Sequence, residues 1–146
     1  MITLRDYQSD CIAAVRHDWR EIDRTLVVMA TGTGKTVVFL ALLDQLRTDG
    51  ELGRALIIAH RRELIYQPIE RAQEMFPDLA WNMGVVMADQ DDAGARIVVA
   101  TVQSLASNGR LGRILAAGRI SHVIIDECHH TTADTYRSVL DAPAGR

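Results

Sequence analysis

The chain has 146 residues, and 48% of them are hydrophobic. This length and apolar fraction are typical of one globular domain and too small for two. The formal net charge of −3 argues against a protein that coats nucleic acid by charge alone, although it is compatible with a basic patch on one face.

The sequence has no sign of secretion or of a membrane span. Its two cysteines, Cys11 and Cys128, are too few for a disulfide framework. The first ten residues lack the apolar core of a signal peptide, and no apolar run reaches the length of about 18 residues that a membrane span needs. These observations predict a soluble, cytoplasmic protein.

The apolar residues alternate between short runs and helical spacing, which is typical of an α/β fold with a mostly parallel sheet flanked by helices. A first helix is expected over residues 5–20, with Thr3 as its cap. Its inward positions are expected to be Cys11, Ile12, Val15 and Trp19. Strands are expected at 25–30, 54–59, 96–100 and 121–127, with a weaker strand at 81–87 and an acidic, exposed loop at 88–95.

Two more helices are expected between these strands. The second helix carries apolar residues at helical spacing and ends at Gly50. The third helix follows the strand at 54–59 and contains Pro68, which removes a backbone bond and is expected to bend it. The inward residues of the two helices are Phe39, Leu42, Leu43 and Leu46, and then Ile65, Ile69, Ala72 and Phe76.

A stretch rich in Gly and Thr joins the first expected strand to the second helix. Lys35 lies in it and is the only lysine of the chain, since every other basic residue among the 16 is Arg. A compact ammonium on a thin stem suits a narrow phosphate cradle better than the wide Arg fork does. Free N–H groups at a helix start favour an anion at the same place. The predicted P-loop comprises Thr31, Gly32, Thr33, Gly34, Lys35 and Thr36.

In this interpretation Lys35 reaches the β- and γ-phosphate oxygens of ATP, and the Thr36 hydroxyl binds Mg²⁺. The pattern departs from the usual one at Met29, where Gly or Ala is customary. The alternative is an ordinary Gly/Thr-rich turn before a core helix. The strand, loop and helix context favours the P-loop.

The stretch HVIIDECHH (122–130) ends an apolar strand on two carboxylates. Ligands of open α/β sheets bind at such strand ends. Asp126 is expected to hold Mg²⁺, through water, and Glu127 to polarise the attacking water. One alternative is a strand that ends in a solvated acidic turn. Another is a zinc site made by Cys128, His129 and His130, although three adjacent side chains diverge and rarely bind one ion.

Five motifs in order resemble the N-terminal RecA-like domain of superfamily 2 helicases and translocases of the DEAD/DEAH-like type. The DECH version and the P-loop are most similar to the branch of type I and type III restriction-enzyme motor subunits. The resemblance implies a RecA-like P-loop NTPase over the whole of residues 1–146. The motifs are LRDYQ (4–8), MATGTGKT (29–36), AHRRELIYQ (59–67), VATVQSLA (99–106) and DECHH (126–130).

The resemblance implies roles for residues outside the phosphate site. Gln8 is expected to bind the N6/N7 edge of adenine, and Arg5 to stack on or bond the base. The alternative for Gln8 is an ordinary residue in the first turn of a helix. His130 is expected to couple the ATP site to the next motif, and its alternative is a buried structural residue. Contacts to nucleic-acid phosphates are expected from Arg61, Arg62, Thr101 and Gln103. Phosphate contacts make binding insensitive to sequence. The alternative for the two arginines is a solvated helix start.

The resemblance also implies further elements of the family fold beyond this chain. A helix resembled by TADTYRSVL (132–140) precedes a strand ending in Ser/Thr-Ala-Thr, and a second RecA-like domain supplies arginine fingers. We therefore expect a piece of a larger helicase or DNA translocase that is inactive alone. Its expected partners are DNA, more than RNA, and a nuclease or methylation subunit. A non-catalytic P-loop module for binding or assembly is the alternative.

Overall fold

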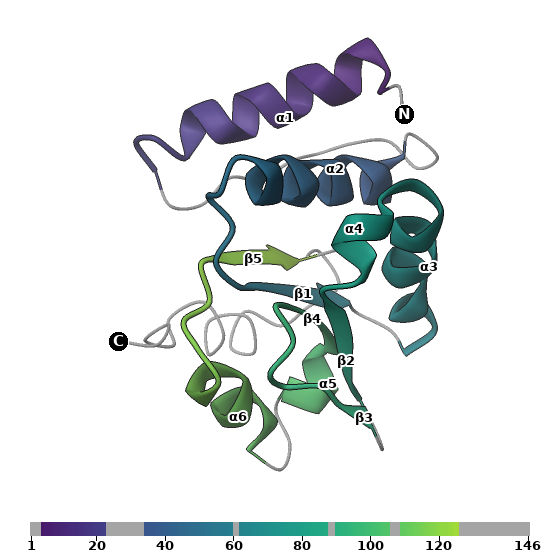
Figure 1. Ribbon diagram of the computed structural model, residues 1–146, viewed down its shortest axis with the longest axis vertical. Coiled ribbons are helices and arrows are strands. Elements are labelled where there is room, and N and C mark those ends of the chain that lie inside the picture. The colour runs from purple at the N-terminus through teal and green to yellow at the C-terminus, as the bar shows by residue number, and fades with distance from the viewer. Residues whose placement is uncertain (1–3, 23–33, 60–61, 88–89, 106–108, 126–146) are drawn as a thin grey trace.

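The computed structural model describes residues 4–22, 34–59, 62–87, 90–105 and 109–125 (Figure 1). The strand expected at 25–30 and the helix at 132–140 lie outside these residues. The helices are α1 (Asp6–Asp18), α2 (Lys35–Thr48), the 3-10 helix η1 (Arg62–Leu64), α3 (Tyr66–Met75), α4 (Pro77–Ala80), α5 (Val102–Leu105) and α6 (Arg110–Ala116). The strands are β1 (Ala55–Ala59), β2 (Met83–Met87), β3 (Gln90–Asp91), β4 (Ile97–Thr101) and β5 (His122–Ile125).

The described strands form one sheet in the order β3-β2-β4-β1-β5. The pairs β2·β4, β4·β1 and β1·β5 are parallel, and β3 alone is antiparallel to its neighbour β2. All five residues of β1 and of β4 are buried, as parallel strands covered by helices on both faces must be. The expected mostly parallel sheet flanked by helices is therefore confirmed.

Alternation along each strand divides the core into two layers. Ala55, Ile57 and Ala59 of β1 point into a layer shared with α1, α2, α3 and α4. Leu56 and Ile58 point to the opposite face, where they pack with residues of α5 and α6. Figure 1 shows the same division, with α1 and α2 on one side of the sheet and α5 and α6 on the other.

The first helix is close to its expected bounds, but its cap is different. Arg5 occupies the N-cap position of α1 with an extended backbone, not Thr3, which lies outside the described residues. Ile12 and Val15 are buried, while Cys11 and Trp19 are partly buried against the same core. None of the described helices is long and apolar enough to cross a membrane.

The expectation that Pro68 interrupts a helix is wrong. The chain first makes the 3-10 turn at Arg62–Leu64, and α3 begins only at Tyr66. Pro68 is therefore in the first turn of α3, where the N–H group that proline lacks would have no partner within the helix. Proline at this position starts the helix without bending it.

The acidic loop expected at 88–95 is also more ordered than its composition suggests. Gln90 and Asp91 pair with Met87 and Val86 as a short antiparallel strand. Asp92 accepts a hydrogen bond at 3.0 Å from the backbone N–H of Val85. A Cβ atom on Gly84 would lie 2.6 Å from the Cβ of Asp92, so the return strand packs at this point because residue 84 has no side chain. Both β3 residues remain exposed.

β5 lies at one side of the described sheet. Its residues are half-buried, whereas every residue of the neighbouring β1 is buried. Of the strands that the structure describes, only β1 pairs with β5. The family resemblance implies that the strand ending in Ser/Thr-Ala-Thr, beyond this chain, lies between β5 and the strand at 25–30. The resulting gap stays a prediction, since residues 25–30 lie outside the described residues.

Arg54 joins the start of β1 to two segments distant in sequence. Its guanidinium donates hydrogen bonds to the backbone carbonyls of Ala93 and Ala95, before β4. It also donates to the carbonyls of Ile114 and Gly118 at the end of α6. Burial lowers the pKa of Arg54, because the charged form loses part of its hydration. Its four carbonyl partners offset that loss.

We expect Arg54→Met to lower the free energy of unfolding by about 2–4 kcal/mol, because four partly buried carbonyls lose a charged donor while the side-chain volume is nearly kept. Arg71→Met is the matched control. The Arg71 side chain is 53% exposed, and its contact with Glu74 is long, at 3.8 Å. Urea unfolding of both variants measures the difference, and equal losses would contradict this role of Arg54.

Candidate functional site

The predicted site residues that the structure describes gather at the carboxyl end of the sheet. The parallel strands β1, β4 and β5 all end at this edge, as do the chain segments leading into η1 and α5. In Figure 1 the arrowhead of β1 and the first turns of α1 and α2 lie on the same side of the molecule. Residues from four separate motifs therefore converge, as expected for an open α/β sheet.

Gly34 begins α2 and is the described end of the predicted P-loop. It is the N-cap residue, with φ of +80°, and no side chain caps the helix there. The first turn of α2 has no acidic residue. The first N–H groups of a helix have no partner within it, and they carry the positive end of the helix dipole. This end of α2 is therefore suited to an anion.

Gln8 reaches the P-loop from α1. A Cβ atom placed on Gly34 would lie 2.6 Å from Nε2 of Gln8, so the side-chain amide of Gln8 lies directly against the glycine. Gln8 is only 6% exposed, and its Oε1 accepts a hydrogen bond at 2.9 Å from the backbone N–H of Arg5. This bond fixes the orientation of the amide. The Arg5 side chain is exposed beside it and donates to the Tyr7 hydroxyl at 3.4 Å.

Lys35 and Thr36 are the first two residues of α2, and both are half-buried. The rest of the predicted P-loop, Thr31 to Thr33, lies outside the described residues. Thr36 lines an open polar pocket of about 310 Å³ between α2 and α3. The motifs do not predict the α3 side of this pocket, although its polar residues recur at the helical spacing of three and four positions. The α3 residues that line it are Gln67, Glu70, Arg71 and Glu74.

The predicted nucleic-acid contacts differ in their accessibility. Arg62 is exposed at the start of η1, and Gln103 is exposed on α5. Thr101 is 2% exposed, and its Oγ1 accepts a hydrogen bond at 3.1 Å from the backbone N–H of Ser104. The Thr101 side chain thus holds the first turn of α5, and Gln103 is the accessible residue of this pair. Arg61 lies outside the described residues.

The carboxylate half of the predicted site falls beyond the described part of the chain. β5 ends at Ile125, which pairs with Ile58, and Asp126, Glu127 and His130 follow outside the described residues. The same holds for the alternative zinc ligands Cys128 and His129. Within the described ranges, no three His, Cys, Asp or Glu side chains lie close enough to hold a metal ion. Metal binding by Thr36 and Asp126 stays a prediction.

We expect Gly34→Ala to destabilise the protein more than Gly50→Ala. Both glycines have left-handed backbones, with φ of +80° and +74°, so both variants incur the cost of about 1–2 kcal/mol for a Cβ in this conformation. Only at Gly34 must the new Cβ also displace Gln8, because nothing lies within 4 Å of a Cβ at Gly50. Thermal unfolding of the two variants measures this difference.

Gly34→Ala and Gly50→Ala, each combined with Gln8→Ala, isolate the contact between Gln8 and residue 34. The excess cost of Gly34→Ala, about 1 kcal/mol for a disturbed hydrogen bond, should shrink when the Gln8 amide is gone. An excess that is unchanged in that background would show that Gln8 is not its cause.

Comparison with known proteins agrees with this arrangement. A family model described as "Type III restriction enzyme, res subunit" matches residues 1–144. The chain is 39% identical over 144 residues to the putative ATP-dependent helicase IRC3 of Saccharomyces cerevisiae, covering 94% of this chain and 20% of that protein. It is 31% identical over 147 residues to the putative mitochondrial ATP-dependent helicase irc3 of Schizosaccharomyces pombe, covering 96% and 23%. The chain thus spans about a fifth of these relatives.

Among solved structures, the chain resembles the SWI2/SNF2 ATPase core of Sulfolobus solfataricus in complex with dsDNA. The TM-score is 0.72 at 21% sequence identity, over 86% of this chain and 26% of the other. This likeness shows the fold, a RecA-like helicase core. The resemblance drawn from the motifs is confirmed: the chain belongs to the family of type III restriction enzyme res subunits, and it has the fold of the N-terminal RecA-like domain of superfamily 2 helicases.

Proposed function

We propose that this chain is the ATP-binding half of a nucleic-acid-dependent ATPase, either a helicase or a DNA translocase. The observation that carries the proposal is the contact between Gln8 and Gly34, which brings the predicted base-binding residue against the predicted phosphate loop. Two motifs separated by a whole helix meet at the start of α2. A nucleotide has its base and phosphates joined by one ribose, so it needs such an arrangement.

At the phosphates, the N–H groups of the P-loop and the start of α2 would hold the β-phosphate of ATP. Lys35 would contact the β- and γ-phosphate oxygens as a point charge, and Thr36 would bind Mg²⁺. A Mg²⁺ ion supplies positive charge to the developing transition state when it is bound. Asp126 would hold that ion through water, and Glu127 would accept the proton of the attacking water.

At the base, Gln8 would offer its amide to the N6/N7 edge of adenine. Its bond to the backbone of Arg5 supports this role, because an amide whose orientation is fixed discriminates better than a rotating one. The exposed Arg5 guanidinium lies at the same helix start, where it is accessible to the base.

For nucleic acid, we propose that Arg61, Arg62 and Gln103 contact phosphates at the carboxyl edge of β1 and β4. The exposure of Arg62 and Gln103 supports this. Thr101 would act by holding α5 rather than by direct contact, and His130 would couple the ATP site to the next motif. DNA is the preferred partner because the structural relative is an ATPase core bound to dsDNA, and nuclease or methylation subunits are further candidate partners.

We expect Lys35→Ala to weaken the binding of Mg·ATP or ADP about tenfold or more, because the principal charge partner of the phosphates is lost. Isothermal titration calorimetry measures the affinities. Lys35→Arg should fail to restore full affinity, since the wider guanidinium does not fit the same cradle. Equal affinities for the original protein and Lys35→Ala would remove the P-loop interpretation.

Turnover is expected to need more than residues 1–146. In the family resemblance, arginines of a second RecA-like domain complete the charge around the γ-phosphate, and such an arginine is worth about 10³–10⁵ in rate. Residues 1–146 alone should therefore show negligible ATPase when nucleic acid is added. A longer protein with the second domain should show ATPase that rises with added DNA.

In that longer protein, Glu127→Gln should abolish hydrolysis and spare ATP binding, because it removes the proton-accepting charge and keeps the size. Steady-state phosphate release and nucleotide titration test both parts. Stimulated hydrolysis by residues 1–146 alone would contradict the need for a second domain. A longer protein that binds ATP and never hydrolyses it would favour a non-catalytic module.

A further inference from the structure

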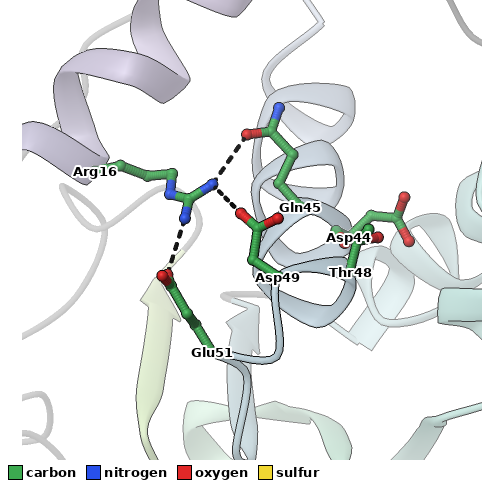
Figure 2. Close-up of polar contacts among 6 residues, drawn as sticks. All are labelled: Arg16, Asp44, Gln45, Thr48, Asp49 and Glu51. Atoms are coloured by element: carbon green, nitrogen blue, oxygen red, sulfur yellow. Dashed lines mark hydrogen bonds and ion pairs between the residues drawn. The ribbon is translucent and has the colours of Figure 1, made fainter.

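α1 is attached to α2 at two places. At its start, Gln8 lies against Gly34, the N-cap residue of α2. At its last turn, Arg16 reaches the opposite end of α2 (Figure 2). The two helices therefore run in the same direction, and the two attachments are eight residues apart on α1. An α-helix rises about 1.5 Å per residue, so Gln8 and Arg16 lie about 12 Å apart along the axis of α1.

The attachment at Arg16 is a branched set of polar contacts (Figure 2). One guanidinium nitrogen, Nη1, donates to Oδ2 of Asp49 at 2.8 Å and to Oε1 of Gln45 at 3.5 Å. The other, Nη2, donates to Oε2 of Glu51 at 2.8 Å. The Arg16 side chain is 28% exposed, so the contacts are partly shielded from solvent. The bond to Asp49 and the two nearby carboxylates raise the pKa of Arg16.

The position of the carboxylates gives Arg16 a role that an ordinary surface ion pair lacks. Asp49 is the C-cap residue of α2, where the helix dipole is negative, and Glu51 follows two residues later. Negative charge is unfavourable there unless a cation offsets it. Arg47, the basic residue in the last turn of α2, donates to Asp44 instead, at 2.8 and 3.1 Å. Arg16 brings the balancing charge from another helix.

The apolar contacts of α1 do not by themselves fix its position along α2. Ile12 and Val15 are buried, but hydrophobic contact is not directional. Two short bonds from one planar guanidinium are directional. Beyond Arg16, the Trp19 ring lies 5.2 Å from the His122 ring, which ties the end of α1 to β5. Arg16 thus makes a directional polar contact between the last turn of α1 and the end of α2.

We propose that Arg16 is a positioning residue for recognition of the nucleotide base. By holding the last turn of α1 on the end of α2, it fixes where the Gln8 amide lies relative to the P-loop. This inference rests on the proposed function, in which Gln8 binds adenine. The α-helix between the two residues is the rigid connection, and base recognition requires placement within a fraction of an ångström.

Arg16→Gln tests the inference, because it removes the charge and keeps part of the length. Calorimetry would measure the affinities of the protein for Mg·ADP, Mg·GDP and inorganic triphosphate. We expect the preference for ADP over GDP to fall about threefold to tenfold, the loss typical of one or two partly exposed ion pairs. The affinity for inorganic triphosphate, which has no base, should stay the same. A loss of phosphate affinity equal to the loss of ADP affinity would overturn the inference.

Arg47→Gln is the matched control. Arg47 has a similar exposure of 26% and also pairs with a carboxylate of α2, but that pair lies within α2 and does not reach α1. Its removal should leave the ADP preference unchanged. Arg16→Lys, which keeps one charged donor, should restore part of the preference. Equal effects of Arg16→Gln and Arg47→Gln would mean that only general stability matters, which overturns the inference.

Gln8→Ala separates the inference from the proposed function. If Gln8→Ala loses the ADP preference and Arg16→Gln keeps it, the inference is wrong and base recognition by Gln8 stands. If Gln8→Ala keeps the preference, base recognition by Gln8 is wrong and the inference fails with it. Should Arg16→Gln not fold, Asp49→Asn and Glu51→Gln remove the negative charges of its partners one at a time, and each should lower the preference. An unchanged preference in both would overturn the inference.

Hydrogen exchange gives a readout that needs no nucleotide. With Arg16→Gln, the backbone amides of Gln8 and Ser9, which bond to the Arg5 carbonyl, should exchange faster than in the original protein. The amides in the middle of α2, away from both attachments, should be unaffected in Arg16→Gln. Unchanged protection at both amides would show that Arg16 does not hold the start of α1, and would overturn the inference.

Discussion

Burial of a parallel sheet on both faces is the constraint on which this structure depends. β1 and β4 consist entirely of buried residues, and helices of both layers must cover them. Parallel strands also leave the sheet at one common edge. The segments after β1 and β4, together with the starts of α1 and α2, therefore meet there, and this meeting forms the candidate site.

The amino edge of the sheet, where the parallel strands begin, and the carboxyl edge, where they end, have different roles. At the amino edge, Arg54 donates to carbonyls before β4 and at the end of α6, and Arg96 donates to the carbonyls of Leu52 and Gly53. Ser121 accepts from the N–H of Gly53 and donates to the carbonyl of Arg54. These bonds satisfy backbone groups at the strand starts. The carboxyl edge presents the exposed Arg5, Arg62 and Gln103 instead.

α1 connects the two edges, because it runs along α2 from the phosphate loop to the distant end. Its apolar residues Ile12 and Val15 join the core, while its polar contacts lie at its two ends. A helix held in this way can be adjusted at one end by contacts at the other. The arrangement explains why a residue remote from the candidate site, Arg16, bears on the geometry of Gln8.

The sequence by itself determined the α/β class, the parallel strands and the family, because apolar alternation and the motifs depend on local residue order. It predicted Gln8 and Gly34 as site residues, but their contact depends on how α1 lies on α2. The start of α3 at Tyr66, the short strand β3 and the burial of Thr101 were decided by tertiary structure. So were the bonds of Arg16 and Arg54, which join residues 29 to 64 positions apart. Local sequence carries no signal for such partners, since only the packed fold brings them within hydrogen-bonding distance.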